Sequence, residues 1–471
     1  MKTNFTRRNF IKLSAISSAF LGFSGFTPKM NQETVLERID KLSSTPISKG
    51  KSIIGLTVPP IKQVRVAFIG LGNRGIDHLQ LVDALSPDKA TIVAICDVQK
   101  EKVEAGLAEL EKSGHGQKPK TYSGSLDIWK EMIKRDDIDL VIIATPWEEH
   151  ANMSIESMKN NKHVAVEVPA AYTLEDIWKM VDTAEEMQRN CMMMENVCYG
   201  DEELWLLNMA QQGIFGTLTY AECAYIHNLR ELMFSKDYYY NMWRIRHHEV
   251  RDGNLYPTHG LGPVAQYMDI NRGDSFEKLV SMSSLQASLD EYSKQIESTN
   301  EFHNRTGYKH GDINNSLIKT AKGRTILVQH DVVTPRPYNR INALAGTKGY
   351  HEGYPSRLSL VNIDKGHEWL KEDDYKQYWD KYQHPLWQKL KSGIEKYSSH
   401  GGMDFVMIYR LIDCLNNGWF LDQDVYDAAS WSVVTPLSAI SIDLGDVPVK
   451  FPDFTRGKWS EGRELGILKN Y

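Results

Sequence analysis

The chain has 471 residues, of which 41% are hydrophobic and 25% are charged, and its formal net charge is −6. These proportions are ordinary for a globular protein, and the lack of a basic block beyond the N-terminal segment argues against a nucleic-acid partner. The five cysteines are odd in number and form no Cys-x-x-Cys pair, which argues against a disulfide framework and against a metal site. The length favours two domains, since α/β enzymes often run long.

The N-terminus combines an arginine pair with an apolar stretch. Residues 6–12 read TRRNFIK, and an apolar run follows over 13–23. This is the twin-arginine export pattern, so residues 1–30 are predicted to be a signal and the protein is expected in the periplasm. The run is too short for a stable membrane span and holds no cysteine for lipidation. Residues 31–60, rich in Ser, Thr, Lys and Pro, are predicted to be a linker.

From residue 61 to residue 198 short apolar strands alternate with amphipathic helices. Because the strands are apolar on both faces, this pattern predicts a Rossmann domain with a parallel, doubly wound sheet. Thr173 is expected to cap a helix over 173–188, on which Glu185 and Glu186 are expected to face solvent. The strands are expected at 64–70, 90–96, 140–145, 163–168 and 191–195.

Residues 199–471 show a different pattern and are predicted to form a second α/β domain with an open, mostly antiparallel sheet. Its helices are expected at 202–212, 403–416 and 424–441, the last two packing back on the first domain. If His247 and His248 lie in a strand they face opposite ways, so at least one of them is expected to be structural. The β-type segments are 217–225, 278–287, 314–320, 325–330 and 340–345.

The first strand runs into a glycine-rich turn, GLGNRG, at residues 70–75. Gly70 permits the tight turn, Gly72 lets the backbone approach a pyrophosphate, and Gly75 allows close helix–strand packing. About 20 residues further on, Asp97 ends the next strand, where an acid binds the adenosine ribose hydroxyls and repels a 2′-phosphate. The sequence therefore predicts a dinucleotide site that takes NAD rather than NADP.

Export and an NAD site rarely occur together. A compartment without a soluble nicotinamide pool cannot exchange NAD, and the twin-arginine route carries proteins that are already folded around their cofactors. We therefore expect one tightly bound NAD per subunit, regenerated in each turnover.

Three motifs, GLGNRG at 70–75, TPWEEH at 145–150 and EVP at 167–169, resemble the Gfo/Idh/MocA oxidoreductase family. Its members join a Rossmann domain to an open-sheet α/β domain, and its dehydrogenases usually carry EKP in the third motif. Val168 replaces that Lys, and an apolar side chain cannot act as an acid or base. The stretch 243–274, with Tyr225–His227 and HGGMDF at 400–405, closely resembles glycoside hydrolase family 109, the NAD-dependent α-N-acetylgalactosaminidases.

This resemblance implies contacts for both ligands. The implied NAD contacts, with the three glycines, are Asn73, Arg74, Asp97, Trp147, Glu148, Glu149, His150, Glu167, Val168, Asn196 and Tyr256. The implied sugar contacts are Tyr225, Arg244, Tyr256, Pro257, Thr258, His259 and Tyr338.

Two functions from different classes are consistent with these residues. The first is a glycosidase that releases terminal α-N-acetylgalactosamine from glycans by transient oxidation at C3, elimination and addition of water. Its proton-transfer candidates are His259, then Tyr338, then Tyr256. The alternative is a periplasmic sugar oxidoreductase with nondissociating NAD(P), which predicts EKP. A homodimer is also expected, because an open sheet face is a common dimer surface in this superfamily.

Overall fold

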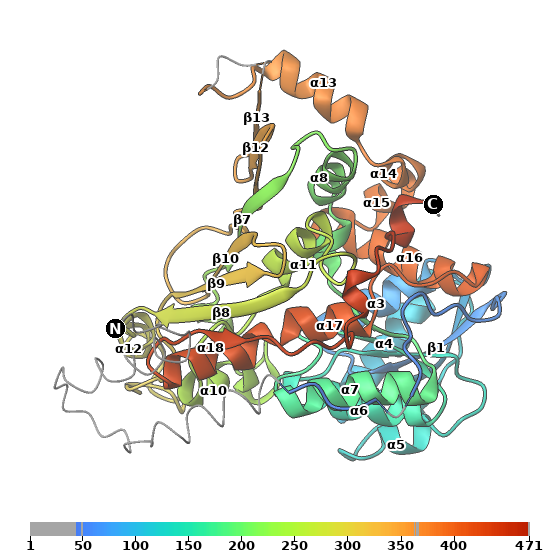
Figure 1. The fold of residues 1–471 in the computed structure, drawn as a ribbon. Coiled ribbons are helices and arrows are strands. Elements are labelled where there is room, and N and C mark those ends of the chain that lie inside the picture. Colours follow the sequence, from blue (N-terminus) through green and yellow to red (C-terminus); the bar gives the residue numbers. More distant parts are fainter. Residues whose placement is uncertain (1–43, 49, 362, 364–366, 470–471) are drawn as a thin grey trace.

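The computed structural model describes residues 44–48, 50–361, 363 and 367–469, so the predicted twin-arginine signal lies outside the described residues. Figure 1 shows two sheet-containing domains side by side, with the C-terminal helices lying across both. In the described part of the chain, no helix is long and apolar enough to cross a membrane.

The first domain is a six-stranded parallel sheet in the order β3-β2-β1-β4-β5-β6, which confirms the predicted Rossmann topology. Strands β4 and β5 are buried at every residue because helices cover both faces. Thr173 caps α7, as predicted, by accepting a hydrogen bond from Asp176 N. The strands are Val64–Ile69, Ala90–Cys96, Lys120–Tyr122, Leu140–Ile143, His163–Val166 and Cys191–Met193 for β1 to β6, and the main helices are α3 (Asn73–Asp83), α4 (Lys100–Ser113), α6 (Trp147–Lys159) and α7 (Leu174–Met187).

The second domain holds an eight-stranded sheet in the order β13-β12-β11-β7-β10-β9-β8-β14. All neighbouring strands are antiparallel except β7 and β10, so the prediction of a mostly antiparallel sheet is confirmed. The strands are β7 (Leu218–Ile226), β8 (Phe276–Ser283), β9 (Asn314–Thr320), β10 (Thr325–Asp331), β11 (Ala343–Gly346), β12 (Gly349–Glu352), β13 (Arg357–Leu360) and β14 (Val449–Lys450).

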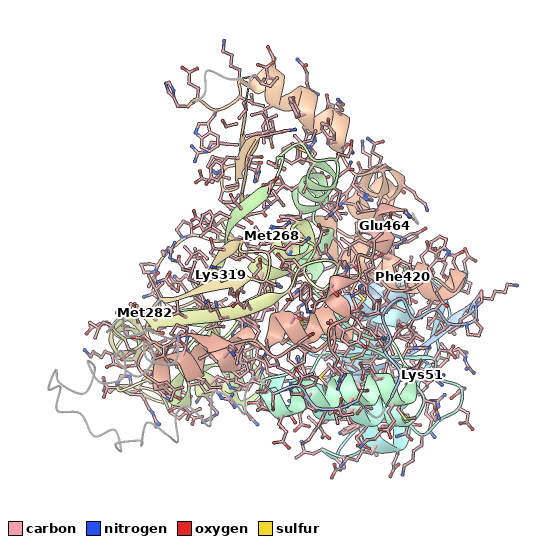
Figure 2. All side chains as sticks on the ribbon, in the orientation of Figure 1. Lys51, Met268, Met282, Lys319, Phe420 and Glu464 are labelled. Atoms are coloured by element: carbon pink, nitrogen blue, oxygen red, sulfur yellow. The ribbon has the colours of Figure 1, made fainter. Side chains whose placement is uncertain are left out.

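One face of this sheet is covered and the other is open. Along β9 buried and exposed residues alternate strictly, which places every second side chain in solvent. Helices α11 (Thr258–Tyr267) and α18 (Val434–Asp443) pack against the covered face through β7 and β8. Figure 2 labels Met282 and Lys319 on β8 and β9, and both are exposed.

The segment with His247 and His248 is a helix, α10 (Trp243–Val250), on which both side chains are buried. One helix prediction for the second domain is wrong. The single helix expected over 424–441 is two helices, α17 (Val425–Ser432) and α18, which meet at Val433. The break has a local cause, because Pro436 has no N–H to donate to Ser432 O one turn earlier.

Part of the segment predicted as a linker over 31–60 is packed against the fold. Residues 50–62, here called the N-terminal belt, pack onto the fold. Ile53 is 2% exposed and donates its N–H to the Tyr426 hydroxyl on α17 (3.1 Å), while Ile61 N donates to Leu415 O on α16 (Met403–Asn417; 3.0 Å). The belt therefore joins the last helices of the chain to the start of the Rossmann domain.

Glu185 does not face solvent, contrary to expectation. It is buried on α7, where it accepts hydrogen bonds from Tyr426 Oη and Arg456 Nη1, both at 2.7 Å. A buried carboxylate is tolerated here because a cation and a hydroxyl satisfy it.

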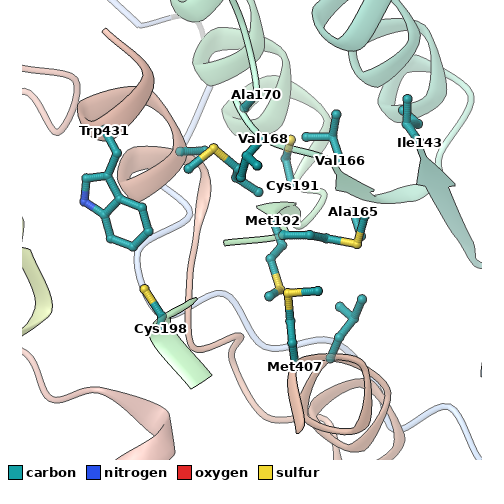
Figure 3. Packing of buried hydrophobic residues seen from close by; sticks show 14 of the residues in the cluster. Ile143, Ala165, Val166, Val168, Ala170, Cys191, Met192, Cys198, Met407 and Trp431 are labelled. Carbon is teal, nitrogen blue, oxygen red and sulfur yellow. The ribbon is translucent and has the colours of Figure 1, made fainter. Parts of the chain in front are cut away.

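Buried apolar side chains form one continuous cluster through both domains. Figure 3 shows part of it, where Met192 of β6 lies next to Met407 of α16 and Trp431 of α17 lies beside Cys198. All five cysteines are free and buried. The two domains share one hydrophobic core and are therefore expected to hold a fixed relation to each other.

Candidate active site

A cavity of about 1230 Å³ lies at the carboxyl ends of the Rossmann strands, between the two domains. This is the edge of a parallel sheet at which ligands bind in doubly wound folds. Most of the predicted site residues line it: Gly70, Gly72, Asn73, Arg74, Asp97, Trp147, Glu148, Glu149, His150, Glu167, Val168, Asn196, Tyr225, Arg244, Tyr256 and His259.

The glycine turn fits a dinucleotide. Gly70 has a φ of +90°, and a Cβ there would lie 2.4 Å from Ala144 O. A Cβ on Gly75 would lie 2.1 Å from Gly70 O, so this glycine packs helix against strand and does not line the cavity. A Cβ on Gly72 would meet no atom within 4 Å. The open side at Gly72 and the free N-terminus of α3 fit a pyrophosphate.

Asp97 stands at the end of β2 with its carboxylate fixed. Its two oxygens accept hydrogen bonds from Leu71 N (2.7 Å) and Gln99 N (2.9 Å). The carboxylate lies in the cavity wall next to the glycine turn, where an adenosine ribose is placed in Rossmann folds. The residues present therefore fit NAD.

Glu167 follows β5 and is held as a carboxylate. It accepts hydrogen bonds from His78 Nε2 (2.6 Å) and Arg74 Nε (3.1 Å), both on α3. Burial opposes ionisation, but the charge of Arg74 and the His78 hydrogen bond outweigh it and hold the pKa of Glu167 well below its usual range. Glu167 therefore has no proton to donate near neutral pH.

Asp404, at the start of α16, is fully buried behind the cavity wall. Burial opposes its ionisation, but the hydrogen bond from His400 Nδ1 (2.7 Å) and the charge of Arg74 outweigh that effect, so the pKa of Asp404 lies far below its usual range. Because Nδ1 of His400 is bound to the carboxylate, Nε2 is the nitrogen left to exchange protons. His400 lines the cavity and is half exposed.

His259 forms a second pair of this kind. Its Nδ1 donates to Glu195 Oε1 (2.8 Å), and Glu195 is fully buried. Its Nε2 lies 3.5 Å from the Tyr256 hydroxyl, at the limit of a hydrogen bond. This carboxylate–imidazole geometry fixes the tautomer and leaves Nε2 as the acceptor.

Arg244 lies beside this pair within a ring of aromatic side chains. Its Nη1 donates to the Tyr239 hydroxyl (3.2 Å), while Nε and Nη2 are buried without a hydrogen-bond partner among the described residues. Buried donors need an acceptor, so a ligand oxygen is expected here. The guanidinium carbon lies 5.0 Å from the ring centroids of Trp147 and Tyr256, 5.7 Å from that of Tyr239 and 6.0 Å from that of Tyr225.

Two of the predicted NAD contacts, His150 and Glu148, hold parts of the protein together. His150 is buried with its ring nitrogens 2.8 Å from Pro169 O and Thr145 O, so it ties two turns of the cavity wall together. Glu148 lies 2.9 Å from His247 Nε2 of α10, a contact between the two domains.

Three predicted sugar contacts do not line the cavity. Pro257 and Thr258 are buried at the start of α11 and carry the backbone that presents Tyr256 and His259. Tyr338 lies outside the cavity wall, 41% exposed, with its ring 5.2 Å from that of His227 and its hydroxyl accepting from Arg340 Nη1 (2.8 Å). Its predicted part in proton transfer stays a prediction.

Sequence reasoning missed the partners of these groups, namely His78, Glu195 as the partner of His259, and Asp404. HGGMDF at 400–405 held the signal for Asp404, since an acidic residue after two glycines marks a helix start.

A cluster of three buried histidines lies in the second domain, outside the cavity wall. The ring centroids of His248 and His310 are 4.5 Å apart, and those of His310 and His330 are 5.2 Å apart. His310 Nε2 donates to Gly253 O (3.0 Å), whereas His248 Nδ1 and both His330 nitrogens find no partner in the described ranges. Burial, reinforced by the neighbouring imidazoles, lowers the pKa of His248 and His330 well below the usual value.

Comparison with known proteins assigns a family to each of the two domains. A family model described as the oxidoreductase family, NAD-binding Rossmann fold, matches residues 64–195, so the first half is an NAD-binding Rossmann domain. The model for the C-terminal domain of glycosyl hydrolase 109 matches residues 199–461.

Full-length relatives agree with these matches. A "Glycosyl hydrolase family 109 protein" of Shewanella putrefaciens is 48% identical over 99% of both chains. A protein of Shewanella oneidensis named alpha-N-acetylgalactosaminidase is 47% identical, again over 99% of both. The chain belongs to glycosyl hydrolase family 109 and is a glycosidase, which confirms the resemblance found in its motifs.

The fold also occurs in solved structures. Levoglucosan dehydrogenase in complex with NADH is similar with a TM-score of 0.61 and 16% identity, covering 83% of this chain and 100% of that one. At this identity the likeness shows the fold alone.

Proposed function

We propose that this protein releases terminal α-linked N-acetylgalactosamine from glycans by a redox-neutral elimination and addition that uses bound NAD. The observation that carries the proposal is one cavity holding both the dinucleotide turn and two carboxylate-bound histidines, His259 and His400. The name of the Shewanella oneidensis relative supports the substrate class.

The carboxylates argue against direct displacement. That reaction needs a protonated carboxylic acid beside the leaving oxygen. Burial opposes the ionisation of Glu167 and Asp404, but their arginine and histidine partners outweigh it and hold both pKa values far below the usual range. Glu195 is taken up by His259. The buried carboxylates at the cavity therefore serve to orient other groups.

The histidines suit elimination instead. When bound, NAD⁺ would accept a hydride from C3 of the sugar and return it at the end of turnover, while the proton of the C3 hydroxyl is released to water in the cavity and taken up again when the ketone is reduced. A C3 ketone makes the C2 proton acidic, so Nε2 of His259 takes it as the bond from C1 to the leaving oxygen breaks. His400 gives a proton to that oxygen. Water then adds at C1 and C2 regains its proton, which restores both histidines.

Val168 supports this assignment over sugar dehydrogenation. It is buried at the cavity next to Glu167, at the position where dehydrogenases of the superfamily usually carry Lys. A valine cannot assist proton transfer at an oxidised carbon.

The reaction in D2O tests the proposal. We expect deuterium at C2 of the released sugar, measured by mass spectrometry and NMR, from a chromogenic α-N-acetylgalactosaminide hydrolysed without added NAD. A panel of α- and β-hexosaminides fixes the substrate class. Hydrolysis with no label at C2 would contradict the mechanism, and turnover of β-linked substrates alone would contradict the predicted anomer.

We also propose that one NAD stays bound to each subunit through every turnover. The supporting contact comes from the second domain, since Asn73 Nδ2 at the phosphate-binding turn donates to Tyr238 O (3.4 Å). Tyr238 and Tyr239 also line the cavity, so a segment of the second domain lies against the phosphate-binding turn.

Export by the twin-arginine route to the periplasm is proposed from the sequence pattern, which lies outside the described residues. Cell fractionation tests it, with the paired change Arg7→Lys and Arg8→Lys expected to hold the protein in the cytoplasm. Periplasmic recovery of that variant would contradict the route.

A homodimer remains a proposal, supported by the open face of the second sheet. Met282 (56% exposed), Leu285 (82%) and Leu317 (44%) place apolar side chains on that side of the molecule. An exposed apolar surface of this kind is typical of a protein contact. Light scattering should give twice the subunit mass, and Leu317→Lys should halve it.

A further inference from the structure

We infer that Asp404 is a positioning residue that couples NAD binding to the second domain. The inference rests on the proposed function, since it takes NAD to bind in this cavity. Asp404 does not line the cavity itself, yet each of its side-chain hydrogen bonds holds a residue that does.

The carboxylate of Asp404 is fully engaged. Oδ1 accepts hydrogen bonds from Asn196 Nδ2 (2.7 Å) and Arg74 Nη2 (3.2 Å). Oδ2 accepts from Arg74 Nη1 (2.9 Å) and His400 Nδ1 (2.7 Å). Four donors around one buried carboxylate leave it no freedom to turn, so it fixes all three partners.

These partners come from both domains. Arg74 is on α3, directly after the glycine turn, and Asn196 follows β6 of the Rossmann sheet, whereas Asp404 and His400 belong to the last third of the chain. Asp404 holds Asn196 by its amide nitrogen, so Asn196 Oδ1 remains buried without a partner among the described residues. That oxygen is set to accept from a ligand.

Asp404 also holds the Arg74 guanidinium between two buried carboxylates. The guanidinium contacts Glu167 through Nε and Asp404 through Nη1 and Nη2, and it reaches Asp77 at the solvent side (3.2 Å). Without Asp404, Arg74 would keep Glu167 as its one buried carboxylate and turn toward it. The N-terminal turn of α3 and the wall at Asn196 would then lose their fixed relation.

A neutral amide cannot replace this carboxylate. Both oxygens accept from two donors, so the NH2 group of an asparagine would face N–H donors in either orientation. Asp404→Asn keeps the shape of the side chain and removes the function. Asp77→Asn is the matched control, because it also removes a carboxylate from Arg74 but leaves Asn196 and His400 untouched.

The test measures NAD binding directly. Each variant is purified, stripped of nucleotide and titrated with NAD, and the thermal midpoint of the stripped protein is recorded alongside. We expect NAD affinity to fall at least about tenfold in Asp404→Asn, as for loss of a charged hydrogen bond, and to stay unchanged in Asp77→Asn. Asp404→Glu, which keeps the charge, should restore part of the affinity.

The outcomes separate this inference from other roles. Wild-type NAD affinity in Asp404→Asn overturns it, and a lower thermal midpoint with that affinity assigns Asp404 a purely structural role. If Asp404→Asn does not fold, Asp404→Ser takes its place, and wild-type NAD affinity in that variant overturns the inference. If the wild-type protein binds no NAD, both this inference and the proposed function are overturned. If NAD affinity is the same in the wild type and in the Asp404 variants, this inference alone is overturned.

Discussion

Acidification should destabilise this protein through its buried histidine cluster. His248 and His330 are fully buried, and burial followed by the neighbouring imidazoles and Arg244 lowers their pKa well below the usual value. A histidine whose pKa is lower in the folded state than in the unfolded state leaves the free energy of unfolding unaffected at a pH above the unfolded pKa. As the pH falls below the unfolded pKa, the free energy of unfolding decreases, because the unfolded chain binds a proton and the folded chain does not.

The size of the effect follows from this difference. With an unfolded pKa near 6.5, each such histidine removes about 1.4 kcal/mol of unfolding free energy between about pH 7.5 and about pH 5.5. His248 and His330 together remove about 3 kcal/mol, a large part of the stability of a typical domain. His163 and His384, with pKa lowered to about 4 mainly by burial, titrate in the same direction but are common to all variants compared below.

Urea unfolding followed by tryptophan fluorescence over this pH range measures the slope. His330→Gln keeps a polar side chain of similar size that cannot titrate, so the stability lost between about pH 6.5 and about pH 5.5 should fall by about 1 kcal/mol. Exposed His367→Gln is the control and should leave the slope unchanged. An unchanged slope in His330→Gln would refute the reasoning, since His330 would then titrate equally in both states.

Three further predictions concern the cavity. Asp97→Ala should increase loss of NAD during gel filtration, measured from the nucleotide absorbance of the denatured protein, because the ribose hydroxyls lose their acceptor; retention equal to wild type would contradict the assignment. His259→Ala should lower kcat by roughly 10²–10⁴ while bound NAD and the circular dichroism spectrum stay the same; near-full activity would make Tyr338 the leading candidate. Val168→Lys should lower kcat for hydrolysis at least about tenfold, because a buried ammonium near Glu167 and Arg74 disturbs the charge balance of the site; wild-type kcat there would contradict that view.

Local signals made the Rossmann half predictable. Five of the six strands are short apolar runs, the turn at 70–75 has its glycines at required spacings, and Asp97 stands where the next strand ends. The five predicted strands of the second sheet were found for the same reason. Strand β3, with the sequence Lys-Thr-Tyr, carries no apolar run and was not predicted. Strands β12, β13 and β14 were not predicted either, since they are short and their sequences are mixed in polarity.

The pairs that complete the site could not be predicted, because each joins residues far apart in the chain. Asp404 and Arg74 are separated by 330 positions, and His259 and Glu195 by 64. Glu185 shows the same limit, since only the folded chain brings Tyr426 and Arg456 to it. In the sequence alone, a carboxylate that will be buried has the same appearance as one that faces water.

The N-terminal belt sets a limit on how far the N-terminus of the chain can be shortened. Ile53 fills a buried position against α17, and Ile61 is hydrogen-bonded to α16, so removing these residues would expose apolar surface along the seam between the domains. If the proposed signal is removed, we therefore expect the cut upstream of residue 50. The belt can pack in place only after α16 and α17 have been synthesised, so these early residues are among the last to reach their final position.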